Sequence, residues 1–384
     1  MNKSFESRYC CRFRGTGGVN ETLNRNMKRL LAVALGAAVL FATVAGAQQA
    51  ADKTSATKGS AKEGKQNATA VAQRPLVLSG SVPMDGVKGR FDHFASGKGR
   101  VFISALGNNT VEVINLFGGI VEHTITGATN PQGVAFSPDA NKLFVASAQG
   151  KLYIYDGDSF NLITTLDFEG GADNLRYDAA TKRVYVGCGD DEKNGAIAAV
   201  DAVTNQRLDE EYKIGGEPES FQLESSGPSI YVNIPDLQQI AVINRETKKI
   251  TRWPLTGLRK NFPMALDEAD HRLFVGIREP ARLAIFNTTS GRMIAALPSA
   301  EDADDLYYDA EHKRIYVPGG EGAVYVFQMI DPDHYHLLAK VPTALGARTA
   351  GYFGRLGKGM HRFFIAVPAS GGQTAEMRIY TIQE

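Results

Sequence analysis

Seven short segments place polar or charged side chains at equivalent points of an internal repeat. Aligned on that repeat, the segments are Asp92-His93, Gln132-Gly133, Asp173-Asn174, Glu219-Ser220, Phe262-Pro263, Asp304-Asp305 and Arg348-Thr349, and four of the seven begin with a carboxylate. Carboxylates that converge raise one another's pKa or recruit a cation, because like charges at close range are costly. Oxygen ligands of this kind suit Ca²⁺ or Mg²⁺, and His93 would admit a transition metal.

Basic residues near these segments allow two other interpretations. Arg259, Lys260 and Arg348 would neutralise the acids in plain ion pairs, or groups of both charges would bind an organic ligand. The candidate ligand-binding residues are therefore Asp92, His93, Gln132, Asp173, Asn174, Glu219, Lys260, Asp304, Asp305 and Arg348. Within this set the candidate ligands of a divalent cation, Ca²⁺ or Mg²⁺, are Asp92, His93, Asp173, Glu219 and Asp304.

The remaining chemical signals are weak. His271, His312 and His361 each fall in the hairpin before a second strand and are predicted to be solvated turn residues. The repeat region contains no Gly-x-Ser-x-Gly elbow, Walker loop, dinucleotide fingerprint or Cys-x-x-Cys pair. No catalytic residue is assigned, and no cofactor is required by the pattern.

The elements that must position these residues form a repeat of about 40 residues. Each unit has an apolar trio at the end of its second strand, and consecutive trios are 42, 41, 46, 43, 42 and 48 residues apart. The trios begin at Val101, Leu143, Val184, Ile230, Leu273, Ile315 and Phe363. A third strand with period-2 alternation follows each trio, for example at Lys151 to Asp156. The period predicts an all-β, seven-bladed β-propeller of four-stranded antiparallel blades.

The seventh unit lacks its fourth strand. Only Thr381 to Glu384 follow the third strand of this unit, and an unpaired edge strand would template aggregation. The segment Leu76 to Met84 has the pattern of a fourth strand and precedes the first unit. We predict that it closes the ring as the outer strand of blade seven. In such a ring the first strands line the central channel, so the candidate residues just before them face one mouth of the channel.

The first 75 residues differ from the repeats. Met27 to Ala47 has the basic start, apolar core and small-residue end of a secretory signal peptide, with cleavage expected after Ala47. Residues 1–26 are expected to be an extension upstream of the true start, and residues 48–75 are expected to be a disordered linker because they hold almost no large apolar side chain. The folded domain is then residues 76–384. We expect a periplasmic or extracellular protein with no stable membrane span after signal removal.

The balanced overall charge conceals an acidic domain. The chain has 42 basic and 42 acidic residues; residues 1–47 hold seven and two of them, and residues 48–75 hold five and two, which leaves 30 basic and 38 acidic residues, or about −8, for residues 76–384. An acidic domain is a poor partner for a phosphate backbone, so nucleic acid is not an expected partner. Cys188 is the one cysteine after residue 75, so we expect no disulfide there and a buried thiol. We also expect a monomer.

Several phrases resemble a known family. The second strands end in Val184-Tyr185-Val186-Gly187 or Ile315-Tyr316-Val317-Pro318, a third strand reads Ile240-Ala241-Val242-Ile243-Asn244, and the first strand of the second unit lies in Pro131 to Asp139. These phrases resemble the YVTN-repeat, YncE-like, WD40-like propellers of exported bacterial proteins over residues 76–384. Such relatives include surface-layer-like modules, partner subunits of oxidoreductases and a protein credited with binding single-stranded DNA. That last role needs basic grooves and aromatic platforms, which an acidic domain with Trp253 as its one tryptophan does not suggest.

A looser resemblance is to six-bladed lactone hydrolases, which hold an axial divalent cation with Glu, Asn and Asp. Asp173, Asn174, Glu219 and Asp304 have matching residue types, but the blade count and the repeat differ. Our leading hypothesis is a non-enzymatic binding module that uses the channel mouth for a small ligand or a protein partner. The alternatives are a metal-dependent, lactonase-like hydrolase with an axial divalent cation and a partner subunit of a periplasmic oxidoreductase.

Overall fold

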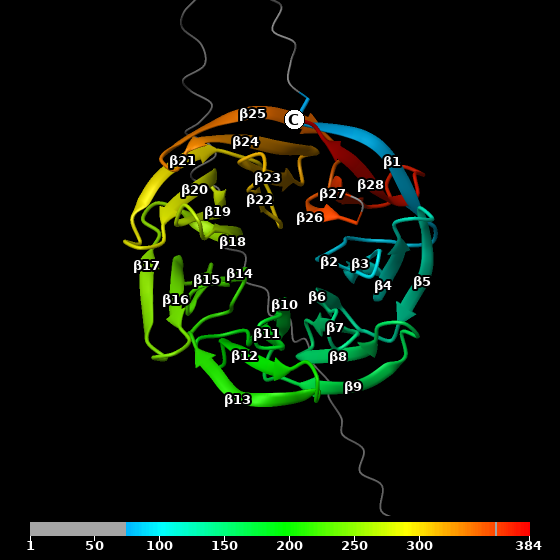
Figure 1. Cartoon of the computed structure of the whole chain (residues 1–384), viewed down its shortest axis with the longest axis horizontal. Helices are drawn as coiled ribbons and strands as arrows, with labels where there is room; N and C mark the ends of the chain where they lie inside the picture. Colours follow the sequence, from blue (N-terminus) through cyan, green and yellow to red (C-terminus); the bar gives the residue numbers. More distant parts are fainter. Residues whose placement is uncertain (1–73, 358) are drawn as a thin grey trace, which may run out of the picture. The chain divides into compact units, whose positions relative to one another are not determined.

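The computed structural model describes residues 74–384 except residue 358. Seven four-stranded antiparallel sheets are arranged in a ring around a common axis (Figure 1). This arrangement confirms the predicted seven-bladed propeller. The upstream extension, the signal peptide and nearly all of the linker, expected within residues 1–73, lie outside the described residues.

Each blade has four strands, which follow one another outward from the axis. The first four blades are β2 (Phe94–Gly97), β3 (Arg100–Ala105), β4 (Thr110–Asn115) and β5 (Ile120–Thr126); β6 (Pro131–Ser137), β7 (Lys142–Ser147), β8 (Lys151–Asp156) and β9 (Leu162–Asp167); β10 (Ala172–Asp178), β11 (Arg183–Cys188), β12 (Ala196–Asp201) and β13 (Gln206–Lys213); and β14 (Phe221–Leu223), β15 (Ser229–Ile234), β16 (Gln239–Asn244) and β17 (Ile250–Pro254). The last three are β18 (Arg259–Asp267), β19 (Arg272–Glu279), β20 (Ala281–Asn287) and β21 (Met293–Pro298); β22 (Tyr307–Asp309), β23 (Arg314–Gly319), β24 (Ala323–Asp331) and β25 (His334–Pro342); and β26 (Thr349–Leu356), β27 (Met360–Val367), β28 (Ala375–Ile382) and β1 (Leu76–Met84).

The second strands form the best-buried layer. Val184, Tyr185 and Val186 of β11 are at most 1% exposed, because both faces of each blade pack against neighbouring blades. The first residues of the outer strand β13, from Gln206 onward, are mostly polar and partly exposed, so this strand carries no apolar alternation that would reveal it in the sequence. Cys188 is buried, as expected, and burial raises the pKa of its thiol to about 11.

The predicted ring closure is confirmed. β1 pairs antiparallel with β28, from Leu76 opposite Ile382 to Met84 opposite Ala375, and the two strands lie side by side in Figure 1. Leu76, Val82 and Met84 are buried, whereas the residues from Val77 to Ser81 are exposed. The strand therefore contributes both a hydrogen-bonded ladder and three core side chains to blade seven.

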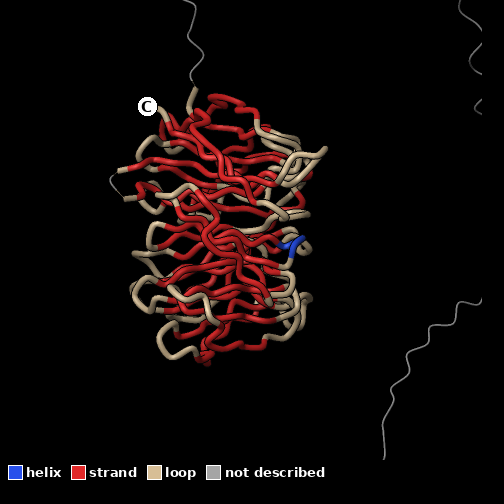
Figure 2. The backbone as a smooth tube through the Cα atoms, turned by 90° about the vertical axis from the view of Figure 1, so that its right-hand side faces the viewer, coloured by secondary structure: helices blue, strands red, loops and turns tan. Residues whose placement is uncertain are grey.

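Loops gather on two opposite faces of the ring (Figure 2). One face carries the links that enter the first strands and the short 3₁₀ turn Leu106–Asn108, and the other carries the hairpins between first and second strands. The backbone N–H of Gly107 in that turn donates to the carbonyl of Arg90 at 2.9 Å, so the turn marks the face of the candidate site. Within the described part of the chain, no helix has the length and hydropathy needed to cross a membrane.

Candidate functional site

A small cavity of about 100 Å³ lies at the mouth of the channel, where the first strands begin. Its lining residues are Arg90, Asp92, His93, Gln132, Asp173, Asn174, Glu219, Ser220, Phe262, Arg278, Asp304 and Arg348. The structure thus brings together the residues selected from the sequence, with the exception of Asp305 and Lys260. We call this cavity and its lining residues the mouth site.

Bulges in three first strands turn consecutive residues toward the mouth site. The pairing register shifts between Pro131 and Val134 in β6, between Ala172 and Leu175 in β10, and between Asn261 and Met264 in β18. A bulge bends the strand locally and redirects its side chains. This is why adjacent residues such as Asp173 and Asn174, which would point to opposite faces of a regular strand, both line the cavity.

The bulge of β6 depends on a glycine. A Cβ atom at Gly133 would lie 2.1 Å from the backbone carbonyl oxygen of Asp173, so Gly133→Ala must push the two strands apart. We expect this variant to lower the free energy of unfolding by about 1–3 kcal/mol, the usual cost of overpacking. Gly171→Ala is the control, because its Cβ would meet its nearest neighbour at 3.5 Å. Urea unfolding measures both, and equal stability of the two variants would contradict the close approach.

His93 lies at the centre of the mouth site and contacts three carboxylates. Its Nδ1 is 3.3 Å from Asp305 Oδ1, and its Nε2 is 3.5 Å from Asp92 Oδ1 and 3.8 Å from Asp173 Oδ1. Burial alone lowers the pKa of His93, but these carboxylates outweigh it and raise the pKa to about 10. The imidazole is therefore a cation at neutral pH.

Asp92, Asp173 and Glu219 of the mouth site have pKa values above the usual range of a carboxyl group. Burial, followed by repulsion from Asp173 and Asp304, raises the pKa of Asp92 to about 7 despite the attraction of His93. Burial also raises the pKa of Asp173, and burial with repulsion from Asp173 and Glu217 raises that of Glu219. Because these groups interact closely, they titrate as a set rather than one by one. With a pKa of about 7, Asp92 is partly protonated at neutral pH.

Two arginines occupy the opposite side of the mouth site. Arg348 contacts Asp304 Oδ2 through Nε and Asp302 Oδ1 through Nη1, both at 2.6 Å, and Arg278 pairs with the same two aspartates. The Arg278 guanidinium also lies 3.9 Å from the centre of the Phe262 ring. The plain ion-pair interpretation therefore describes Asp304, whose carboxylate is already shared by two cations.

Two residues selected from the sequence lie elsewhere. Asp305 sits below His93, where its Oδ2 accepts the backbone N–H of Ala350 at 2.8 Å. Lys260 points away from the mouth site and pairs with Glu279, as does Arg259 at 3.1 Å. The backbone at Lys260 is left-handed, with φ of 59°, and its side chain is 55% exposed. The prediction that Lys260 lies at the channel mouth is therefore wrong.

One buried atom of the mouth site has no hydrogen-bond partner. Asp173 Oδ1 is inaccessible to solvent and accepts no hydrogen bond, and its 3.8 Å separation from His93 Nε2 is too long for one. Buried polar atoms are almost always partnered by protein, water or a bound group. The oxygen would accept a hydrogen bond from a donor in the cavity once a small movement of the Asp173 side chain brings it within reach.

A second cavity of about 290 Å³ continues down the channel beneath the mouth site. His93 and Ser220 line both cavities, so they form the floor of the first and the roof of the second. Arg176 enters the deeper cavity, and its guanidinium donates to the carbonyl of Leu175 at 2.8 Å. Burial lowers the pKa of Arg176. Tyr307 lines the same cavity and donates to the carbonyl of Ala350 at 2.7 Å.

Sequence reasoning missed four of these polar residues. Arg176 had a detectable signal, because it follows Asn174 by two positions on an innermost strand and therefore shares its channel-facing side. The sequence gives no such signal for Arg90, which lies in an irregular link, or for Arg278, which lies near the end of the second strand β19. Tyr307 is the first residue of β22, where an aromatic residue is also a normal core choice.

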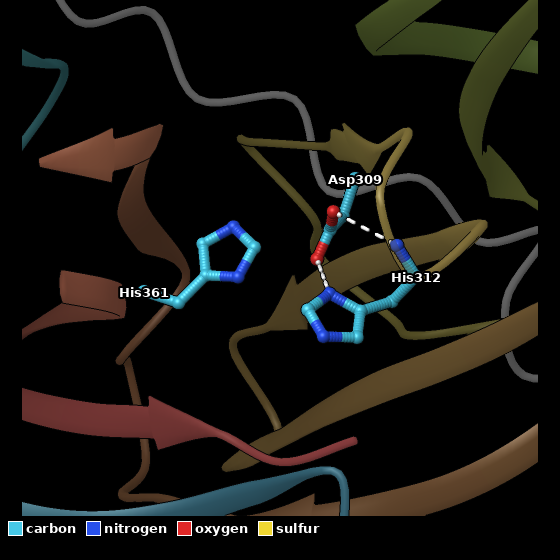
Figure 3. A group of neighbouring side chains, drawn as sticks. All are labelled: Asp309, His312 and His361. Carbon is cyan, nitrogen blue, oxygen red and sulfur yellow. Dashed lines mark hydrogen bonds and ion pairs between the residues drawn. The ribbon is translucent and has the colours of Figure 1, made fainter. Parts of the chain in front are cut away.

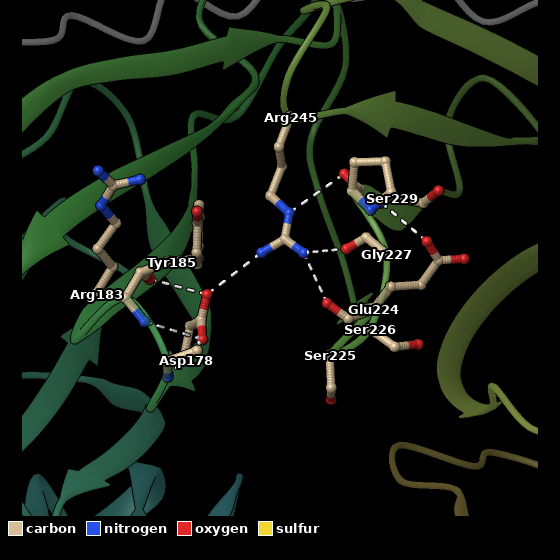
Figure 4. A network of polar contacts seen from close by, with 12 residues as sticks. Asp178, Arg183, Tyr185, Glu224, Ser225, Ser226, Gly227, Ser229 and Arg245 are labelled. Carbon is tan, nitrogen blue, oxygen red and sulfur yellow. Dashed lines mark hydrogen bonds and ion pairs between the residues drawn. The ribbon is translucent and has the colours of Figure 1, made fainter.

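A larger groove lies on the opposite face of the ring. It has a volume of about 620 Å³ and is lined by hairpins of blades three and four, including Asp178, Glu210 and Arg245. Figure 4 shows that Arg245 bridges the two blades. Its guanidinium donates to the carbonyls of Glu224 and Gly227 at 2.6 and 2.5 Å and contacts Asp178 at 3.3 Å. Because these contacts already engage the Arg245 guanidinium, we interpret the groove as a structural contact between blades three and four.

Comparisons with known proteins show the fold and nothing finer. No family model matches the chain. A chain of the mitotic checkpoint complex crystal structure is 13% identical with a TM-score of 0.66, and the match covers 87% of this chain and 99% of that chain. A chain of Kuenenia stuttgartiensis hydrazine synthase is 16% identical with a TM-score of 0.64, covering 77% of this chain and 98% of that chain. At these identities the likeness shows the propeller fold alone.

Proposed function

We propose that this protein is a binding module whose mouth site takes a small polar group that carries hydrogen-bond donors or a positive charge. The observation that carries the proposal is the buried, unpartnered Asp173 Oδ1, which lies among carboxylates of raised pKa. An ammonium group would donate to this oxygen and relieve the repulsion among Asp92, Asp173 and Glu219. The half-exposed Arg90 and the partly buried Arg348 would receive an acidic group of the same ligand.

The size of the mouth site limits what enters it. A cavity of about 100 Å³ is smaller than the roughly 300–1,000 Å³ pockets that bury whole drug-sized ligands. It matches a small zwitterion or the charged end group of a larger molecule, such as a side chain of a protein partner. A small ligand and a protein partner would thus use the same polar anchor.

We also propose that the protein is an exported monomer related to the YVTN-repeat propellers. The support is the signal-like segment Met27 to Ala47 and the repeated Val-Tyr-Val-Gly type of strand ending. Mass measurement of the mature protein tests the export proposal, because cleavage after Ala47 gives a defined new N-terminus. Light scattering of the same sample tests the monomer.

The variant Asp173→Asn should separate binding from stability. Ligand-induced thermal shifts of the full chain would be measured against a panel of amino acids, betaines, diamines and dicarboxylates. We expect an amine-bearing compound to stabilise the wild type and to have no effect on Asp173→Asn. Without ligand, the variant should be more stable than the wild type by about 1 kcal/mol, because it removes one repelling carboxylate from a functional cluster.

Asp167→Asn is the matched control, because its carboxylate is 79% exposed and pairs with Lys151 on an outer strand. The control should keep the ligand response of the wild type. Stabilisation of the wild type and Asp173→Asn by the same compounds would disprove the proposed anchor.

The alternative of a metal-dependent hydrolase is distinguished by the same samples. It requires Asp92, His93, Asp173, Glu219 and Asp304 to share an axial divalent cation, whereas His93 and Asp304 are held in ion pairs. Stabilisation of the wild type by Ca²⁺, Mn²⁺ or Zn²⁺ that is lost in Asp173→Asn, together with metal-dependent turnover of a lactone, would favour the hydrolase over the binding module.

A further inference from the structure

Three side chains that could support or bind a metal ion meet where blade six contacts blade seven. They lie at the opposite ends of the first strands from the mouth site. Asp309 ends β22, His312 lies in the hairpin that follows, and His361 is the second residue of β27 (Figure 3). One ligand atom from each side chain lies within 4.8 Å of the other two. Since the mouth site precedes the first strands and Asp309 ends one, the cluster belongs to the opposite face of the ring.

The two histidines are not the solvated turn residues that the sequence predicted. Their side chains are 7% and 9% exposed, whereas His271, in the equivalent hairpin of blade five, is exposed. The prediction was wrong for His312 and His361 because packing of blade seven against blade six covers this hairpin. The rings lie side by side with centroids 4.9 Å apart. Two buried imidazoles in such close contact suggest a common binding partner.

Hydrogen bonds orient the ring of His312. Its Nδ1 lies 2.7 Å from Asp309 Oδ2, so the Nδ1 proton is donated to the carboxylate and the Nε2 lone pair stays free. Asp309 is itself held by the backbone N–H groups of Glu311 and His312, at 3.1 and 3.3 Å, and by the hydroxyl of Tyr316 at 3.2 Å. A carboxylate that fixes the orientation of an imidazole is the usual support of a metal-binding histidine.

Further oxygen atoms surround the pair. His361 Nε2 is 3.0 Å from the hydroxyl of Tyr352 and 3.8 Å from Glu311 Oε2. His312 Nε2 is 3.9 Å from a carboxylate oxygen of Glu384, the last residue. Small movements of these two exposed glutamates would bring carboxylate ligands to an ion held by the two imidazoles.

We propose that His312 and His361, with Asp309 as the carboxylate that orients His312, form a binding site for a divalent transition metal ion of the zinc class. Two imidazole nitrogens with carboxylate oxygens are the mixed donor set that Zn²⁺ takes in proteins, whereas Ca²⁺ and Mg²⁺ take oxygen ligands. The ion would join the β22–β23 hairpin of blade six to β27 of blade seven. The site is independent of the proposed function of the mouth site.

The location gives the ion a role in holding the ring closed. Arg314, two residues after His312, donates to the carbonyl of Gln383, and the N–H of Gln383 donates to the carbonyl of Pro75 at 3.0 Å. The corner that holds the cluster is thus also the corner where β28 meets the start of β1. A ligand that binds only the folded ring stabilises it by mass action.

Calorimetric titration with Zn²⁺ tests the proposal on the full chain, prepared without a polyhistidine tag and treated with a chelator. We expect one equivalent to bind the wild type. His312→Gln and His361→Gln should each weaken binding by more than about 100-fold, because loss of a direct ligand exceeds the cost of losing a supporting residue. His271→Gln and Asp173→Asn should bind as the wild type does, which separates this site from exposed histidines and from the mouth site.

A measurement without variants guards against misfolding of the two histidine variants. X-ray absorption of the zinc-loaded wild type should show two imidazole ligands and oxygen, and zinc should raise the unfolding temperature until a chelator is added. Absence of stoichiometric binding to the wild type would overturn the proposal. So would a shell with fewer than two imidazoles or with sulfur, which would indicate Cys10 and Cys11 instead.

Discussion

Removing residues 76–84 should abolish cooperative folding of the whole ring. The deletion takes away β1, whose partner β28 would then present an open edge along blade seven. It also exposes the core that Leu76, Val82 and Met84 cover, each worth about 1.5–3 kcal/mol of burial. The summed loss is comparable to the whole stability of a typical domain, about 5–15 kcal/mol. Circular dichroism and size-exclusion chromatography should show an aggregating or partly unfolded chain.

Point variants of β1 test the same closure without shortening the chain. Val82→Asp places a carboxylate where the side chain is 1% exposed and should cost at least about 4 kcal/mol, from lost apolar burial and an unpaired buried charge. Leu78→Asp is the matched control on the same strand, because Leu78 is 54% exposed, and it should change stability by about 0.5 kcal/mol or less. Equal effects of the two variants would contradict the closure by β1.

The fold was predictable because each blade repeats the same physical constraint. The trio from Val184 to Val186 is fully buried in β11, and such runs are visible in all seven units. The third strand of the seventh unit, β28, had no fourth strand after it in the sequence. Because its open edge had to be covered, the segment that forms β1 could be predicted as its partner. Prediction was weakest for outer strands such as β13, where solvent on one side removes the apolar pattern that marks a strand.

The location of the mouth-site residues was predictable from the sequence, but their ion-pair partners were not. Repeat alignment placed Asp92, Asp173 and Glu219 around one cavity, since equivalent positions of a ring face the same axis. It could not show that Arg278 would reach Asp304, because that pairing joins two blades through side chains of unrelated repeat positions. It likewise misplaced Lys260, whose direction is set by a left-handed backbone turn.

The burial of His312 and His361 could not be predicted from their positions in hairpins. A hairpin residue is solvated by default, and His271 follows that rule. His312 occupies the same kind of hairpin but is covered by the neighbouring blade, so its burial is a property of the contact between blades. Single-sequence patterns describe each blade well and describe the contacts between blades poorly. Both proposed sites depend on such contacts.

His93→Gln should be among the most damaging single substitutions at the mouth site. In the wild type this cation faces Asp92, Asp173 and Asp305, with atoms 3.3–3.8 Å apart. Glutamine keeps hydrogen-bonding capacity but removes the charge, which leaves the buried carboxylates uncompensated. Removing one partner of a buried ion pair costs about 3–5 kcal/mol, and we expect a loss of this size at pH 6.5 by urea unfolding. Asp167→Asn should be neutral under the same conditions.

The pH dependence of the wild type should reveal the same group. The pKa of His93 is raised from 6.5 to about 10 on folding, so its stabilising contribution is complete below pH 6.5 and is lost as the pH rises to 10. The pKa of Asp92 is raised from 3.8 to about 7, so the folded state binds more protons than the unfolded state between these values and stability falls there as well. Both groups therefore make the free energy of unfolding decrease from pH 4 to pH 10.

The double variant Asp92→Asn/His93→Gln isolates this effect because it removes both titrating groups and leaves no charge in their place. Its free energy of unfolding should vary less steeply with pH than that of the wild type, both between pH 4 and 7 and between pH 6.5 and 10. Histidine NMR signals of the folded wild type should show one imidazole that remains protonated well above pH 7. A wild type whose stability is flat or rises over pH 6.5–10 relative to the double variant would disprove a buried cationic His93, and with it the electrostatic basis of the mouth site.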